Sequence, residues 1–167
     1  IVDSGVDIDK VAKRIVSGKF VNCGQTCIAP DYIVVNQHVK SDLISAIKEN
    51  IIKTFGNRPL ESESYGRIIN TENLIRLENI IKDQVIEFGG KINMDKLYIE
   101  PTIIVDPQID SEIMNEEIFG PILPILSYEN EAEIKNILDI NPTPLAFYIF
   151  SKNQMFIDNL IENNKFG

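Results

Sequence analysis

Apolar residues along this chain recur alternately at helical and at strand spacing. After Asp7, a residue type that caps helices, apolar positions repeat every three or four residues until about Gly18, which predicts an amphipathic helix. The compact apolar run in 31–36 predicts a buried strand. Helical spacing returns at Ser41 and ends at Phe55-Gly56.

The second half of the chain continues this alternation. Thr71 is predicted to cap one long helix ended by Gly89-Gly90, with Val85 and Phe88 on its buried stripe. The remaining predictions are a strand over 98–105 despite Pro101, a strand over 122–128 in which Pro124 suggests an edge or bulge position, a helix over 129–140, a strand over 145–150 and a helix over 153–163.

Strands that alternate with helices of this length are typical of βαβ units. The predicted fold class is therefore α/β, a mostly parallel sheet with helices on both faces. The 167 residues suit one domain, and no repeat or interdomain linker divides residues 1–167. In such sheets, chemistry gathers in loops beyond the carboxyl ends of the strands.

Composition narrows the function classes. A net charge of −9 and scattered basic residues argue against a nucleic-acid surface and against binding to anionic membranes. No apolar run approaches the length of a membrane span. Two cysteines on one loop do not form a disulfide framework, which favours a reducing, cytoplasmic compartment. Because the chain opens on Ile1-Val2-Asp3 like the tail of a strand and stops just after a helical pattern, we expect a fragment of a longer polypeptide.

The segment 18–30 contains both cysteines and joins a predicted helix to a predicted strand. Cys27 on such a loop is a candidate nucleophile, with backbone N–H groups near it to hold an oxyanion. Asn22, Gly24 and Gln25 supply the amide groups and the backbone freedom that shape a tight turn. The alternative is that Cys27 is a small buried residue, since free cysteine is often buried.

Two other interpretations use the same cysteines. Cys23, Cys27 and His38 provide three potential metal ligands, but their spacing is not that of a zinc finger, and no metal site is predicted. Cys23 is a possible redox partner of Cys27 or, alternatively, a small packing residue. A cysteine–histidine hydrolase has only His38 as its candidate base, and nothing else positions that residue.

The stretch 114–121 is the second unusual segment, with two adjacent carboxylates, an aromatic ring and a Gly-Pro break. Glu117 is a carboxylate of the kind that accepts hydrogen bonds from a ribose diol, and the Phe119 ring is able to pack on a flat heterocycle. The alternative is a short acidic turn before a strand, with Phe119 in the core.

The two segments together resemble the aldehyde dehydrogenase superfamily. Gly-Gln-Thr-Cys-Ile-Ala-Pro-Asp-Tyr, starting at Gly24, is most similar to the class 3, fatty-aldehyde type. The Glu-Glu-Ile-Phe-Gly-Pro run of 116–121 follows some ninety residues later. Three further stretches, 65–69, 99–103 and 144–148, resemble the family in the same order, so that the resemblance covers essentially the whole chain.

The resemblance implies specific roles. Cys27 would be the nucleophile that attacks the aldehyde to give a thiohemiacetal and then a thioester, which water hydrolyses to the acid. Its backbone N–H would form part of the oxyanion hole. Glu117 would hold the nicotinamide ribose of NAD or NADP, and Phe119 would lie near the nicotinamide. Asn22 and Gln25, with Gly24, would shape the loop.

The resemblance also implies what this chain lacks. The general-base glutamate, the oxyanion-hole asparagine and the cofactor-binding domain of the family would precede Ile1, and no dinucleotide-binding glycine motif occurs in 1–167. We therefore expect most of a catalytic domain without turnover of its own. The parent enzyme would take a small-molecule aldehyde and act as a homodimer, cytoplasmic or anchored by a C-terminal tail. The alternative is a non-catalytic binding or scaffolding module descended from a dehydrogenase.

Overall fold

A computed structural model describes all residues of the chain, 1–167. The helices are α1 (Ile8–Phe20), α2 (Lys40–Phe55), α3 (Thr71–Ile81), α4 (Glu112–Asn115), α5 (Glu131–Leu138) and α6 (Gln154–Asn163). The strands are β1 (Ile33–Asn36), β2 (Ile86–Phe88), β3 (Ile92–Asn93), β4 (Tyr98–Ile99), β5 (Thr102–Val105) and β6 (Ile122–Tyr128). None of the helices combines the length and the hydropathy that crossing a bilayer requires.

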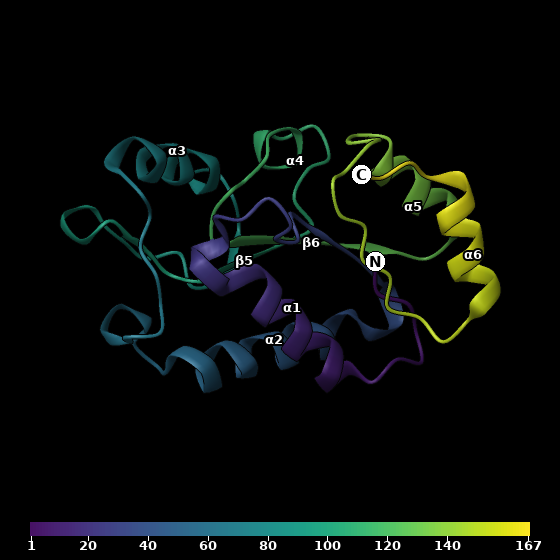
Figure 1. Cartoon of the computed structure of the whole chain (residues 1–167), viewed down its shortest axis with the longest axis horizontal. Coiled ribbons are helices and arrows are strands. Elements are labelled where there is room, and N and C mark those ends of the chain that lie inside the picture. The colour runs from purple at the N-terminus through teal and green to yellow at the C-terminus, as the bar shows by residue number, and fades with distance from the viewer.

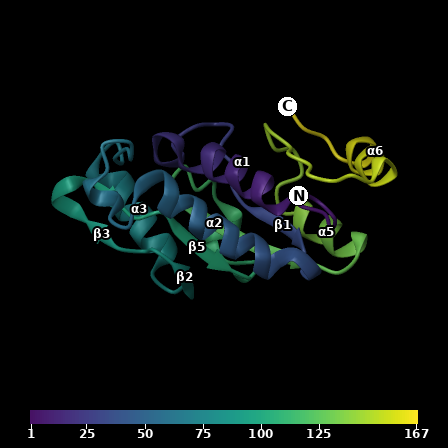
Figure 2. The same ribbon diagram turned by 90° about the horizontal axis from the view of Figure 1, so that it is seen from below.

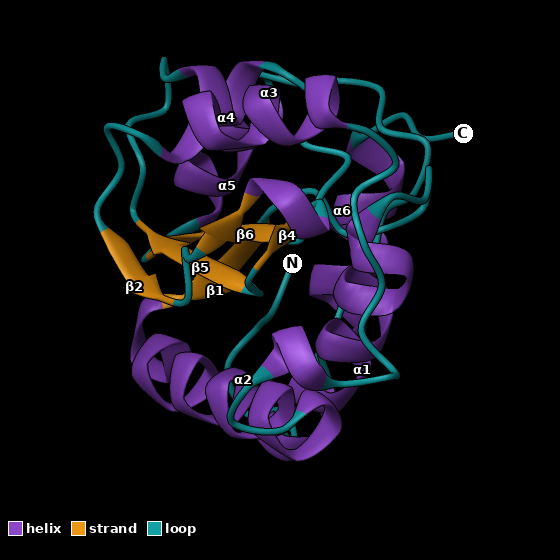
Figure 3. Ribbon diagram, turned by 90° about the vertical axis from the view of Figure 1, so that its left-hand side faces the viewer, coloured by secondary structure: helices purple, strands orange, loops and turns teal.

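The centre of the molecule is a four-stranded sheet with strand order β1-β6-β5-β2. β6 pairs in parallel with both β1 and β5, whereas β2 pairs with β5 in antiparallel fashion. The helices α1 and α2 cover one face of this sheet, and α3, α4 and α5 lie over the other (Figures 1 and 3). Seen from below, α1 and α2 lie side by side across the sheet (Figure 2). The predicted α/β class, with a mostly parallel sheet between two helical layers, is confirmed.

Short polar signals determine where several helices begin. The Asp7 carboxylate accepts a hydrogen bond of 3.1 Å from the Lys10 N–H, which satisfies one of the free donors of the first turn of α1. Asn130 and Asn153 cap α5 and α6 in the same way. For α3 the cap is Asn70 and not Thr71, because the Asn70 side chain accepts from the Asn73 N–H. The helices α1, α3, α5 and α6 begin close to their predicted positions for this reason.

The predicted helix from Thr71 to Gly89 is wrong in its last turns. The helix α3 ends at Ile81, and residues 86–88 form β2 instead. Val85, expected on a buried stripe, is 82% exposed. Pairing of β2 with the edge of β5 outweighs the local helical periodicity, a tertiary effect that no short sequence window contains.

Three strand predictions also need correction. Pro124 lies inside β6, a central strand and not an edge. The β6–β1 register begins only at Ile125, so Pro124 lies one residue before that ladder, where a missing N–H costs least. The predicted strand over 98–105 is divided at Glu100-Pro101 into β4 and β5. The predicted strand over 145–150 is reduced to one bridge between Val2 and Phe150, because no neighbouring strand continues the pairing.

Gly89 is required by the turn between β2 and β3. Its φ is +77°, and a Cβ at this position would lie 1.9 Å from the Pro101 carbonyl oxygen. The turn brings two backbone segments closer together than any side chain permits.

We expect Gly89→Ala to lower the free energy of unfolding by roughly 2–4 kcal/mol, from left-handed strain plus backbone overlap. Gly5→Ala is the matched control, because Gly5 has φ +73° but nothing within 4 Å of the added Cβ. That control should lose only about 1 kcal/mol. Urea denaturation of the two variants measures the difference, and equal losses would contradict the close approach.

Candidate active site

The loop between α1 and β1 is held in an unusual backbone conformation. Three successive residues have positive φ: Asn22 (51°), Cys23 (54°) and Gly24 (70°). At Gly24 the reason is space as well as conformation, because a Cβ there would lie 2.3 Å from the Gly120 carbonyl oxygen. The loop therefore packs directly against the backbone of the 117–120 turn.

Gln25 fixes this loop from inside. Its amide nitrogen donates to the carbonyl oxygens of Asn22 (2.9 Å) and Arg67 (3.0 Å), and its side-chain oxygen accepts from the Ile69 N–H (2.9 Å). The Asn22 amide nitrogen in turn donates to the Gln25 carbonyl at 3.1 Å. The two amide side chains predicted to shape the loop thus bond to each other's backbone and attach it to the 67–69 segment.

The two cysteines lie in opposite environments. Cys27 is exposed, and its backbone N–H has no hydrogen-bond acceptor within the chain. Cys23 is 1% exposed, and burial raises the pKa of its thiol to about 11, against the weaker opposing effects of the Tyr65 hydroxyl and the Arg67 guanidinium. Only the Cys27 thiol is accessible to a reagent, and a free N–H next to it is what an oxyanion requires.

Cys27, Glu117 and Phe119 line one cavity of about 580 Å³. Ninety residues separate the first two along the chain. Phe119 is 41% exposed and has φ +45°, so the alternative that places its ring in the core is wrong. The Glu117 side chain is also exposed. The cavity therefore presents a thiol, a carboxylate and an aromatic ring to the same space.

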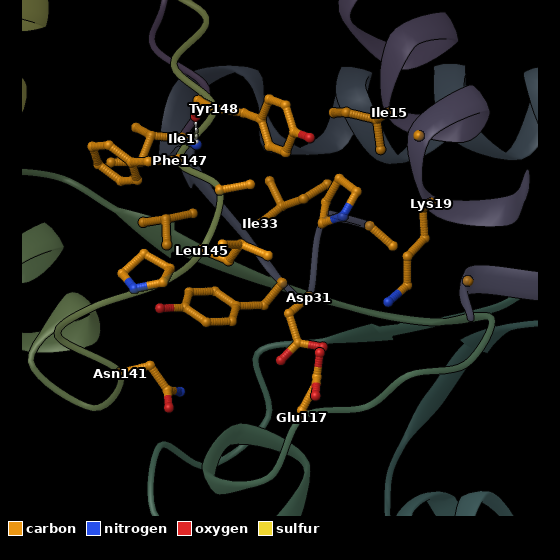
Figure 4. A pocket seen from close by; sticks show the side chains of 18 of the residues that line it. Ile1, Ile15, Lys19, Asp31, Ile33, Glu117, Asn141, Leu145, Phe147 and Tyr148 are labelled. Atoms are coloured by element: carbon orange, nitrogen blue, oxygen red, sulfur yellow. Dashed lines mark hydrogen bonds between the residues drawn. The ribbon is translucent and has the colours of Figure 1, made fainter. Parts of the chain in front are cut away.

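Lys19 is a member of this site that sequence analysis missed. It continues the buried stripe of α1, four residues after Ile15, and is 1% exposed. Burial lowers the pKa of its ammonium to about 8, while the carboxylates of Asp31 and Glu117 act in the opposite direction. In Figure 4 the Lys19 side chain extends toward these two carboxylates. A lysine on an otherwise apolar helical stripe was the available sequence signal.

A second segment, 141–148, forms the opposite wall of the cavity (Figure 4). It contributes Asn141, Leu145 and Phe147, and Tyr148 joins it to the cysteine loop by donating its hydroxyl to the Ile28 carbonyl at 2.9 Å. The wall is mostly apolar, which suits a hydrocarbon chain of a bound molecule better than a charged group.

The residues present fit one end of a nicotinamide dinucleotide. Glu117 is a free carboxylate able to accept from ribose hydroxyls, and the exposed Phe119 ring offers a flat apolar surface beside the thiol. No group of three or more metal-ligating side chains comes together, and His38 is exposed, with its backbone N–H bonded to the Asn36 side chain.

The contrast between the two thiols generates a direct test. We expect iodoacetamide at pH 7.5 to alkylate Cys27 at least tens of times faster than Cys23, because Cys23 is buried and its thiol pKa is about 11. Peptide mass spectrometry over a time course measures both rates. In guanidinium the two rates should converge, and equal rates in the folded chain would contradict the assigned environments.

The buried Lys19 generates a pH-dependent prediction. Its amine titrates near pH 8 in the folded chain and near its ordinary value, about 10.5, when unfolded, so folding at lower pH must bury a charge. Lys19→Met should raise the free energy of unfolding by up to ~3 kcal/mol below pH 8, and this gain should disappear as the pH rises to about 10.5. Lys13→Met, on the exposed side of α1, is the control. Denaturation at pH 7 and pH 10 checks the prediction, and a loss of stability at pH 7 would refute it.

Comparison with known proteins agrees with this geometry. The aldehyde dehydrogenase family model matches residues 1–167. Aldehyde dehydrogenase family 3 member A2 of Mus musculus is 41% identical over 166 residues, 99% of this chain and 34% of that protein. The rat protein named "aldehyde dehydrogenase, dimeric NADP-preferring" is 37% identical over 166 residues, 99% of this chain and 37% of its own length. A substrate-bound structure of Staphylococcus aureus AldH superimposes with a TM-score of 0.94 at 40% identity, covering 98% of this chain and 36% of that one.

The chain spans about a third of the length of the curated relatives it matches. The match of the family model, the class 3 relatives and the shared fold together confirm the resemblance carried by the two motifs. This chain belongs to the aldehyde dehydrogenase family.

Proposed function

We propose that residues 1–167 are most of the catalytic domain of an NAD(P)-dependent aldehyde dehydrogenase and that Cys27 is its nucleophile. The observation that carries the proposal is the meeting of an exposed thiol, an exposed carboxylate and an exposed aromatic ring in one cavity, although Cys27 and Glu117 lie ninety residues apart. If Cys27 were buried, or if Glu117 lay outside the cavity that Cys27 lines, the proposal would have no basis.

The chemistry begins at the Cys27 sulfur. As the thiolate, it adds to the carbonyl carbon of the aldehyde, and the oxygen that becomes negative is stabilised by the free Cys27 N–H. The resulting thiohemiacetal loses its C–H hydride, which leaves a thioester on Cys27. Water then attacks the thioester carbonyl carbon, the carboxylic acid departs and the thiol is restored.

A bound nicotinamide would supply the acceptor for that hydride. Glu117 would hold its ribose through the carboxylate oxygens, and Phe119 would pack near the ring. Asn22, Gly24 and Gln25 hold the loop and do not touch the reacting atoms. NAD and NADP differ at a phosphate that the nicotinamide end does not contact, so these residues serve either cofactor.

The complete enzyme would act as a homodimer on a small-molecule aldehyde. The name of the rat relative, which describes a dimeric enzyme that prefers NADP, supports both the assembly and the cofactor class. The apolar wall of 141–148 supports an aldehyde with a hydrocarbon chain. The isolated 167 residues would show no turnover, because the resemblance places the general base and the cofactor-binding domain outside them.

A chimera tests this function. Residues 1–167 would replace the matching segment of the staphylococcal AldH, whose structure superimposes on this chain with a TM-score of 0.94. The chimera should reduce NAD or NADP when given an aldehyde, as followed by absorbance at 340 nm. Cys27→Ser should lower its kcat at least about a thousandfold, because the thiolate is lost.

Two controls accompany the chimera. Cys23→Ala, at the buried cysteine, should retain most of the activity. The isolated 167-residue chain should show no oxidation of the same aldehyde. A folded chimera with bound cofactor but no activity would favour the non-catalytic module, and turnover by the isolated chain would refute its expected inactivity.

A further inference from the structure

The turn 117–120 is held by side chains from two distant elements. Arg76, on α3, donates to the carbonyl oxygens of Glu117 (3.3 Å) and Ile118 (2.6 Å). From the other side, the Ile118 N–H donates to the Asp31 carboxylate at 3.0 Å. Both backbone groups of the fully buried Ile118 are therefore bound by charged side chains.

This turn needs external support because its backbone is strained. Phe119 adopts φ +45°, a left-handed conformation that a bulky side chain rarely takes. Its ring is 41% exposed, so it is not enclosed by the core on all sides. Such strain persists only where the surroundings determine the geometry independently, and the hydrogen bonds at Ile118 do so.

Asp31 lies on the same loop as the candidate nucleophile, four residues after Cys27 and two before β1. Burial raises the pKa of its carboxyl, while Lys19, the Ile118 N–H and Arg76 act in the opposite direction and favour the ionised form. Charge-assisted hydrogen bonds of this kind are stronger than neutral ones. Asp31 therefore connects the cysteine loop directly to the turn that carries Glu117.

We propose that Asp31 and Arg76 are positioning residues, which clamp the 117–120 turn so that Glu117 and Phe119 face the cavity beside Cys27. What Glu117 and Phe119 do there rests on the proposed function. The clamp itself is a property of this chain and is measured without activity.

Hydrogen exchange in the 167-residue chain tests the clamp. In Asp31→Ala, the Ile118 amide should exchange at least about tenfold faster than in the wild type, because its acceptor is gone. Asp31→Asn should restore most of the protection, since its side-chain oxygen accepts the same bond. In Arg76→Met, which keeps an apolar stem but no donors, exchange across 117–120 should also accelerate at least about threefold.

The Leu126 amide in β6 separates local from global effects. If exchange at Leu126 rises as much as at Ile118, the substitution has destabilised the whole fold, and the local clamp is refuted. Unchanged exchange at Ile118 in Asp31→Ala also refutes it. Asp42→Ala, on the exposed side of α2, is the matched control and should leave both amides unchanged.

The chimera supplies the second readout. Asp31→Ala and Arg76→Met should raise the KM for NAD or NADP at least about tenfold and change kcat less than about threefold, with Asp31→Asn restoring the KM. An unchanged KM overturns the positioning role. An inactive chimera together with the expected exchange pattern would refute the proposed function and support the clamp. An active chimera whose Ile118 amide exchanges at the same rate in Asp31→Ala would support the proposed function and refute the clamp.

Discussion

The site depends on the direct contact between two backbones at Gly24 and Gly120. A Cβ on Gly24 would lie 2.3 Å from the Gly120 carbonyl oxygen, so that no other residue fits there without a shift of the loop or the turn. On one side of this contact is the loop that carries Cys27, and on the other is the turn that carries Glu117 and Phe119. A thiol and a carboxylate from distant parts of the chain share a cavity because of it.

The scaffold makes this contact possible. β1 and β5 flank β6 in parallel, so their connections enter and leave at common edges of the sheet. At the end of α1, Lys19 lines the cavity and Phe20 lies in the core. Gln25 and Asp31 then anchor the two ends of the intervening loop to other segments. Rigid elements thus place a short irregular segment, a common way for a fold to carry chemistry.

Much of the fold could be predicted from the sequence where the signal is local. The Asp7 cap and the run Ile122–Tyr128 appear as expected because capping and strand composition act within a few residues. The predictions failed where tertiary pairing decides the outcome, at β2 and at 145–150. Within the site, the motifs pointed to Cys27 and Glu117, which the structure brings to one cavity. Asp31 and Arg76 contact the 117–120 turn through hydrogen bonds to a distant backbone, and such bonds leave no periodic pattern in the sequence.

The burial of Cys23 has a consequence for the redox chemistry of its neighbour. A surface thiolate that meets peroxide becomes a sulfenic acid, and a nearby second thiol usually converts it to a disulfide before further oxygen adds. Apart from Cys27, the only cysteine within residues 1–167 is Cys23, which is buried in the core and whose thiol pKa is raised to about 11. Within residues 1–167 no second accessible thiol lies ready to react with an oxidised Cys27, so these residues alone leave its sulfenic acid open to a small thiol that enters the cavity or to further oxidation.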